Sequence, residues 1–206
     1  MPVRIVSAGG GGVTLSAAST GSEFTATLPA NTGTVVTTAS SVAVTPAMLT
    51  QPLTLMTAQN STSGTAIDFT GIPSWVRRVT VMFNGVSLNG TSSILVQLGT
   101  SSGVATTGYT STSVGTNGTA GGSLNSTAGF VLRMTLATIT LSGHVVATNV
   151  SGNLWVSSHT AKLDTTSSTF GGGDVTLAGV LDRVRITTVS GTDLFDAGSI
   201  NILYEG

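Results

Sequence analysis

Apolar and polar residues alternate along much of this chain, and a period of two is typical of a half-buried β-strand. The pattern is clearest over residues 139–150, 75–83 (WVRRVTVMF) and 183–189 (RVRITTV). Shorter runs predict further strands, at residues 67–69, 94–98, 130–133, 154–158, 175–177 and 199–204. Many short strands at this spacing indicate an all-β fold, an antiparallel β-sandwich of the jelly-roll kind.

Turn-forming residues separate these runs. Three Asn-Gly dipeptides begin at Asn84, Asn89 and Asn117, and each favours the positive φ angles of a tight hairpin turn. A single helical turn is expected after Thr45, which would cap a helix that starts at Pro46. The sequence therefore predicts hairpins and almost no helix.

Two stretches rich in glycine, serine and threonine carry too few apolar side chains to predict strands. Residues 100–127 hold one aromatic side chain, Tyr109, and predict a long loop. Residues 171–173 (GGG) lack the lysine and the strand-to-helix setting of a phosphate-binding loop. We expect a linker or a turn there.

The first fifty residues differ in texture from the rest, so we expect a stem at residues 1–50 and a β-sandwich head at residues 51–206. Strand-like runs in the stem hold too few apolar side chains to enclose a core, at residues 13–15, 24–28 and 34–38. Either the rest of the chain or identical copies packed around a symmetry axis would cover these runs, and the thin stem favours the copies. The stem therefore predicts self-association.

Composition excludes several classes of function. Charged residues make up 7% of the 206 residues, against about 25% in an ordinary soluble domain, while the chain has 37 Thr, 26 Ser and 27 Gly. A net charge of -1 offers no footprint for nucleic acid or an anionic membrane. The sequence has no run of about 20 apolar residues, so it does not predict a membrane-spanning helix. Residues 1–12 do not resemble a secretory signal.

The few charged residues are placed in ways that predict pairing. Arg77 and Arg78 fall in one predicted strand, and alternation turns Arg183 and Arg185 to the same face of another. Asp182 directly precedes Arg183 in the sequence. We expect cross-strand or intersubunit ion pairs.

Catalytic chemistry is hard to build from this sequence. His144 and His159 are the two histidines, and neither lies in a metalloprotease motif or beside a nucleophile elbow. The chain has no cysteine and no calcium-loop motif. A glycosidase needs two carboxyl groups about 5 to 9.5 Å apart, and the acids to test are Asp164, Asp174, Asp182, Asp193 and Asp196. We expect no enzyme, no metal and no cofactor.

Aromatic side chains are scarce. Trp75, in the phrase GIPSW, is expected to close one end of the core. Tyr109 and Trp155 are the candidates for receptor binding, because a flat apolar ring with a polar tip suits the face of a sugar. Burial in the core is the alternative for Trp155, since large aromatic side chains are usually buried.

Three phrases of the sequence resemble known proteins. Residues 13–40 (VTLSAASTGSEFTATLPANTGTVVTTAS) resemble a segment that recurs in tail fibre and related virion proteins of tailed bacteriophages. Residues 67–99 (IDFTGIPSWVRRVTVMFNGVSLNGTSSILVQLG) and 181–206 (LDRVRITTVSGTDLFDAGSINILYEG) are similar to a module at the distal end of such proteins. The resemblance implies a virion role, commonly as a homotrimer, with the amino-terminal part on the virion and the carboxy-terminal part facing the host. It transfers no active site.

These observations predict a phage virion structural protein, a short tail fibre that binds a host cell-surface receptor multivalently and without catalysis. Ser, Thr and Asn side chains pair with sugar hydroxyls, so the expected receptor is a glycan, with an outer-membrane protein as the alternative. Other tail or baseplate proteins are expected to hold the stem, and the expected location is the virion tail after assembly in the host cytoplasm. The rival functions are a capsid decoration or tail-structural protein without a host ligand, and a polysaccharide depolymerase.

Overall fold

The described part of the chain is built of β-strands. The structure is a computed structural model, and it describes residues 3–6, 12–15, 51–117, 120–134 and 136–206. Within these ranges every regular element is a strand and every strand pairing is antiparallel, as the alternating pattern predicts. The chain divides into two units, Met1–Ala43 and Val44–Gly206.

The first unit contains a short hairpin. Strand β1 (Val3–Val6) pairs with β2 (Gly12–Leu15), with Val3 opposite Leu15. The strand predicted at residues 13–15 is therefore confirmed. The runs at residues 24–28 and 34–38 lie outside the described residues, as does the helical turn predicted at Thr45 and Pro46.

The second unit holds a larger and a smaller sheet. The larger has nine strands in the order β10-β9-β14-β13-β12-β6-β16-β3, and β4 also pairs with β16. Their bounds are β3 (Thr54–Leu55), β4 (Gln59–Asn60), β6 (Arg78–Leu88), β9 (Tyr109–Asn117), β10 (Ala120–Ser126), β12 (Leu141–Ser151), β13 (Leu154–Lys162), β14 (Ser167–Thr176) and β16 (Phe195–Glu205). The smaller has five strands in the order β11-β7-β15-β5, with β8 pairing β7. Their bounds are β5 (Ala66–Thr70), β7 (Ile94–Thr100), β8 (Gly103–Val104), β11 (Phe130–Leu132) and β15 (Arg183–Thr188).

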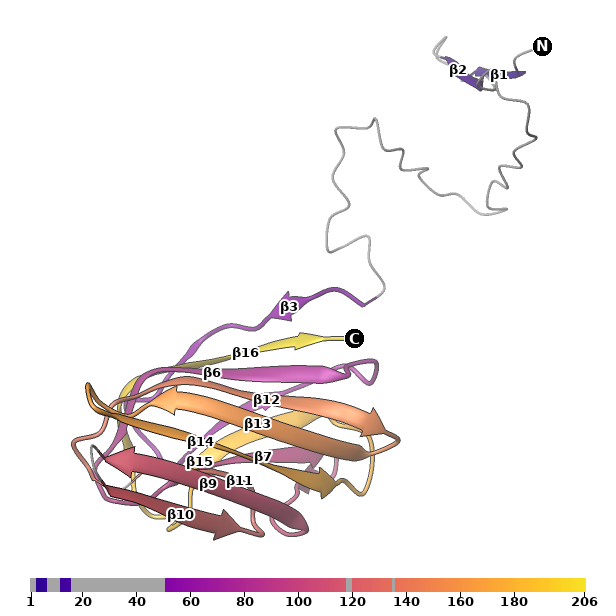
Figure 1. Cartoon of the computed structure of the whole chain (residues 1–206). Helices are drawn as coiled ribbons and strands as arrows, with labels where there is room; N and C mark the ends of the chain where they lie inside the picture. The colour runs from indigo at the N-terminus through magenta and orange to yellow at the C-terminus, as the bar shows by residue number, and fades with distance from the viewer. Residues whose placement is uncertain (1–2, 7–11, 16–50, 118–119, 135) are drawn as a thin grey trace. The chain divides into compact units, whose positions relative to one another are not determined.

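The two sheets pack face to face with the core between them, which confirms the predicted β-sandwich. Figure 1 shows β7, β11 and β15 of the smaller sheet behind the broad face of the larger one. Strand β15 shows how the pattern produces this layer, because Val184 and Ile186 are fully buried while the residues that alternate with them are half-buried. The largest fully buried side chains come from both sheets and include Phe69, Phe130 and Phe195.

Two predictions based on small residues are wrong. Residues 100–127, expected to be a loop, contain β8, β9 and β10, and residues 171–173 lie inside β14 between β9 and β13. Serine and threonine take the inner positions of these strands, and Ser113 and Thr169 are fully buried. A search for apolar alternation misses such strands, because the inward side chains are small and polar.

The three Asn-Gly dipeptides occupy three different kinds of structural position. Asn117 ends β9 opposite Ala120 of β10, so the predicted hairpin is confirmed. Asn89 lies instead on a connection between the two sheets, from β6 to β7. Asn84 and Gly85 lie inside β6 as a bulge, where Gly85 has a φ of 62° and donates its N–H to the Ser142 hydroxyl over 2.9 Å.

Side-chain hydroxyls from the larger sheet bond the edge of the smaller one. Strand β11 pairs with β7 on one side, and the N–H groups on its other side point toward β9. There the N–H of Val131 donates to Ser111 Oγ over 3.0 Å, and the N–H of Arg133 donates to Ser113 Oγ over 3.0 Å. The two sheets are therefore joined by hydrogen bonds as well as by apolar packing.

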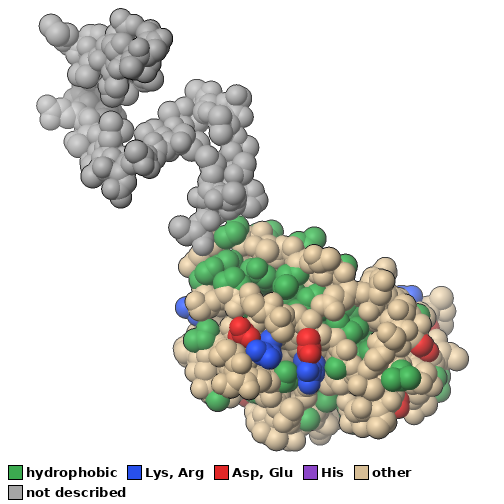
Figure 2. Space-filling model, turned by 180° about the vertical axis from the view of Figure 1, so that it is seen from behind, with side chains coloured by type: hydrophobic (Ala, Val, Ile, Leu, Met, Phe, Trp, Pro, Cys, Tyr) green, Lys and Arg blue, Asp and Glu red, His purple; other side chains and the backbone are tan. Residues whose placement is uncertain are grey.

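Of the five charged residues for which the sequence predicts pairing, four form ion pairs on the surface. Figure 2 shows acidic and basic side chains side by side on one face of the second unit. The ion pairs are Arg78 with Glu205 (3.3 Å), Arg183 with Asp182 (2.9 Å) and Arg185 with Asp68 (2.7 Å). Arg77 forms none of these pairs.

Candidate functional site

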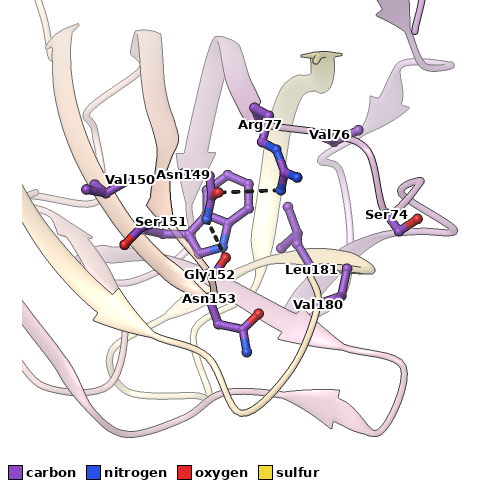
Figure 3. Close-up of a pocket in the computed structure, with 11 residues that line it drawn as sticks. Ser74, Val76, Arg77, Asn149, Val150, Ser151, Gly152, Asn153, Val180 and Leu181 are labelled. Atoms are coloured by element: carbon purple, nitrogen blue, oxygen red, sulfur yellow. Dashed lines mark hydrogen bonds between the residues drawn. The ribbon is translucent and has the colours of Figure 1, made fainter. Parts of the chain in front are cut away.

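A cavity of about 550 Å³ opens beside Arg77, a volume within the range of about 300–1,000 Å³ that small-molecule sites occupy. Three segments far apart in the sequence line it, at residues 74–77, 149–155 and 180–181. The close-up in Figure 3 shows the side chains of this cavity, which we call the Arg77 pocket.

The topology of the sandwich brings the three segments together. Residues 74–77 lie on the connection from β5 in the smaller sheet to β6 in the larger one, and residues 180–181 lie on the return from β14 to β15. The third segment is the hairpin between β12 and β13, where Gly152 takes a φ of 50° that favours glycine. The pocket therefore forms where the chain twice passes from one sheet to the other.

The pocket has an apolar floor and exposed apolar walls. Trp155 and Leu181 are only 2% and 3% exposed, whereas Val150 and Val180 are 57% and 56% exposed. An apolar surface beside hydrogen-bonding groups is the usual arrangement of a small-molecule site.

The polar side of the pocket is centred on Arg77 and Asn149. Asn149 Nδ2 donates to the carbonyl oxygens of Gly152 (2.9 Å) and Leu154 (3.1 Å), so the hairpin fixes this amide. Its Oδ1 faces Arg77 Nη1 at 3.5 Å, as Figure 3 shows. Asn153 adds a second amide to the lining.

The structure places Tyr109 in the core, so the prediction of an exposed sugar platform is wrong for this residue. Its side chain is 2% exposed, and its ring packs edge-on against Phe130 with the ring centroids 5.1 Å apart. The phenol accepts the N–H of Leu98 over 2.7 Å and donates to the Leu98 carbonyl over 3.2 Å. Burial raises the pKa of the Tyr109 phenol.

Trp155 is also buried, which corrects the prediction of an exposed ring and agrees with the alternative of a core residue. It still lines the pocket, as part of the floor. Trp75 is half-buried against the core, with its ring 5.8 Å from that of Tyr204. The structure thus brings one of the two predicted receptor-binding residues to the pocket, though not as a flat exposed face.

The two histidines lie in different surroundings. His144 is exposed on β12, whereas His159 is 4% exposed on β13. His159 belongs to a buried hydroxyl cluster (Ser111, Ser113, His159 and Thr169), in which Ser113 Oγ lies 3.0 Å from His159 Nε2 and 2.8 Å from Thr169 Oγ1. Burial lowers the pKa of His159 from 6.5 to about 4.

The structure gives partners for four of the five candidate acids. These four accept hydrogen bonds, Asp164 from Thr166 (2.6 Å), Asp182 from Arg183 (2.9 Å), Asp193 from Ser92 (2.9 Å) and Asp196 from Ser87. Asp174 is exposed on β14, and Asp196 lies in β16 rather than in a turn. Among the residues that the structure describes, no three His, Asp or Glu side chains gather as a metal site would need.

The chain matches no protein-family model, no curated protein and no solved structure. Within the described ranges, no helix has the length and apolar character needed to cross a membrane. A function must therefore be inferred from the pocket itself and from the sequence.

Sequence reasoning did not find Asn149 or Asn153, and it treated Arg77 as a member of an ion pair. The one available signal was the scarcity of charge, which makes each arginine informative. Nothing in the spacing of residues 77, 149 and 181 predicts that they meet, because their contact depends on the order of strands in two sheets.

Proposed function

We propose that this chain is a virion structural protein of a tailed bacteriophage, a short tail fibre that binds a host cell-surface glycan without catalysis. The observation that carries the proposal is the Arg77 pocket, in which amide and guanidinium groups lie beside an apolar floor and walls. The assignment to a phage comes from the resemblance of residues 13–40, 67–99 and 181–206 to tail fibre proteins.

The chemistry of the pocket favours a sugar over a purely apolar ligand. A saccharide ring has an apolar face that packs on side chains such as Val150 and Val180, and hydroxyls that bond to amides such as Asn153. Each such hydrogen bond contributes about 1 kcal/mol, so a single site is weak. Several copies on one particle raise the overall strength of attachment.

Filling the pocket tests this function. We expect full-length Asn153→Trp to lose at least about tenfold in affinity on an array of bacterial surface polysaccharides, because the indole would occupy the ligand space. The matched control is Ser158→Trp, which adds the same side chain at an exposed position of β13 outside the pocket. Wild-type protein that binds no polysaccharide and no bacterial cell would overturn the proposal, as would equal binding by both variants.

We also propose that the fibre is a homotrimer, and two exposed leucines support contact between copies. Leu53 and Leu55 are 55% and 61% exposed at the start of the second unit, on the edge strand β3 and beside it. Light scattering of the full chain should give three times the monomer mass. The double variant Leu53→Ser, Leu55→Ser should lower that mass, whereas Val189→Ser, which also replaces an exposed apolar side chain, should not. A monomeric wild type contradicts the trimer.

A further inference from the structure

Arg77 lies on the connection before β6 and differs from the arginines in the strands of the sandwich. Arg133, just beyond β11, also has no ion pair with a described residue, but its guanidinium donates to the carbonyl of Gly115 over 3.3 Å. Arg78, Arg183 and Arg185 each pair with a carboxylate, at 2.7 to 3.3 Å. Arg77 forms no ion pair with any residue that the structure describes, and its one side-chain hydrogen bond, to Asn149 Oδ1, is 3.5 Å long. Its positive charge and most of its five donors are therefore open toward the pocket.

The backbone holds Arg77 firmly at the pocket wall. Its N–H donates to the carbonyl of Glu205 over 2.8 Å, and its own carbonyl accepts the N–H of Asn149 over 2.8 Å. The amide of Asn149, fixed by the hairpin, then faces the guanidinium. The backbone of Arg77 is thus fixed, and the planar fork of an arginine loses less conformational entropy per hydrogen bond than a lysine side chain does.

The other residues that line the pocket carry no charge. The guanidinium of Arg77 is therefore the one charged group that lines the pocket. Its charge balances a single negative charge on a ligand. A carboxylate carries one charge and matches the planar fork of arginine with two parallel hydrogen bonds. A phosphate monoester carries about -1.5 to -2 and would remain partly unbalanced.

We infer that the pocket takes an acidic sugar, such as a uronic acid, whose carboxylate pairs with Arg77. The rest of the ring lies against Val150 and Val180 over the Trp155 floor, and its hydroxyls bond to Asn153. This inference deepens the proposed glycan binding and rests on it. It assigns specificity to one charge in a chain that has few.

The test compares acidic oligosaccharides with the same oligosaccharides after reduction of the carboxyl group to an alcohol. We expect full-length wild-type protein, followed by titration calorimetry, to prefer the acidic form by about ten- to a hundredfold. Arg77→Gln should bring that preference close to one. Asn153→Asp, which puts a carboxylate into the lining, should weaken the acidic form several-fold.

Arg78→Gln is the matched control, because it removes a neighbouring arginine that already pairs with Glu205. It should keep the full preference. Arg77→Lys keeps the charge but not the fork, so it should retain only part of the preference. Unchanged thermal melting curves for the variants would show that the fold is intact.

The outcomes separate this inference from the proposed function. If wild-type protein binds both forms equally, or if Arg77→Gln keeps the preference, the acidic-sugar assignment is wrong while glycan binding stands. Tighter binding of sulfated or phosphodiester analogues would overturn the carboxylate in particular. If neither form nor any bacterial surface polysaccharide binds, the proposed function itself fails.

Discussion

The hydroxyl cluster inside the sandwich and the Arg77 pocket at its surface both carry polar side chains, and the two regions differ in how fully these side chains are bonded. In the hydroxyl cluster, Ser113 Oγ has three partners within 3.0 Å, from Arg133, His159 and Thr169. In the pocket, the side chain of Arg77 has one long hydrogen bond within the described part of the chain. Buried polar groups need partners from the protein, whereas groups at an open cavity are available to a ligand. Polar side chains thus close the interior at one place and stay open to solvent at the other.

The largest expected effect comes from the packing around the hydroxyl cluster. A methyl group on Gly171 would overlap the carbonyl oxygen of Thr112 and lie 2.7 Å from Cε1 of His159. We expect Gly171→Ala to lower the free energy of unfolding by more than about 3 kcal/mol, measured by urea denaturation. Gly121→Ala is the control, because the nearest atom would lie 3.9 Å away. Equal stability of the two variants would contradict close packing at the cluster.

The second-largest expected effect is a pH dependence of the free energy of unfolding, which we expect from the hydroxyl cluster and not from the Arg77 pocket. Between pH 6.5 and about 4 the unfolded chain binds a proton at His159 that the folded chain does not, because the imidazole is buried and its Nδ1 has no partner among the described residues. The stabilisation is complete above pH 6.5, and about 3 kcal/mol of it is lost as the pH falls toward 4. Urea denaturation across this range should show the loss in wild type and in His144→Gln, and a smaller one in His159→Gln. A loss of the same size in all three proteins would exclude His159 as its source.

A pair of serine variants gives the smallest effect and the most direct comparison. Ser113→Ala leaves the Arg133 N–H and the side chains of His159 and Thr169 without their shared partner, so we expect about 2 kcal/mol of destabilisation. Ser151→Ala, at an exposed position of the pocket, should change the free energy of unfolding by less than about 0.5 kcal/mol. If Ser151→Ala costs as much as Ser113→Ala, the contrast between the two regions is wrong.

Much of the sandwich could be predicted from the sequence, because apolar alternation marks a strand that has one face in the core. Strands β5, β7, β12 and β15 lie close to where the pattern places them. The larger sheet was harder to predict, since β9 and β14 present serine, threonine and glycine to the interior. Their strand character depends on partners such as Ser113 with His159, which only the fold brings together.

The candidate site was less predictable than the fold. Scarcity of charge drew attention to the arginines, and ion pairing was predicted for Arg77, Arg78, Arg183 and Arg185, but whether Arg77 has a carboxylate beside it depends on strand register. An aromatic ring cannot be assigned to surface or core from its chemistry alone, and both Tyr109 and Trp155 prove to be buried. A site that forms where connections far apart in the sequence come together depends on the order of strands in the sheets, and local sequence patterns do not specify that order.

The serine hydroxyls that bond β11 have a consequence for how copies of this protein behave when crowded together. An edge strand with free N–H groups is a template on which a strand of another molecule can add, and such addition is a route to aggregation. On the outer side of β11, the N–H groups of Val131 and Arg133 already donate to Ser111 and Ser113. A protein with so little charge to keep its molecules apart is thereby protected at this edge by hydrogen bonds of its own.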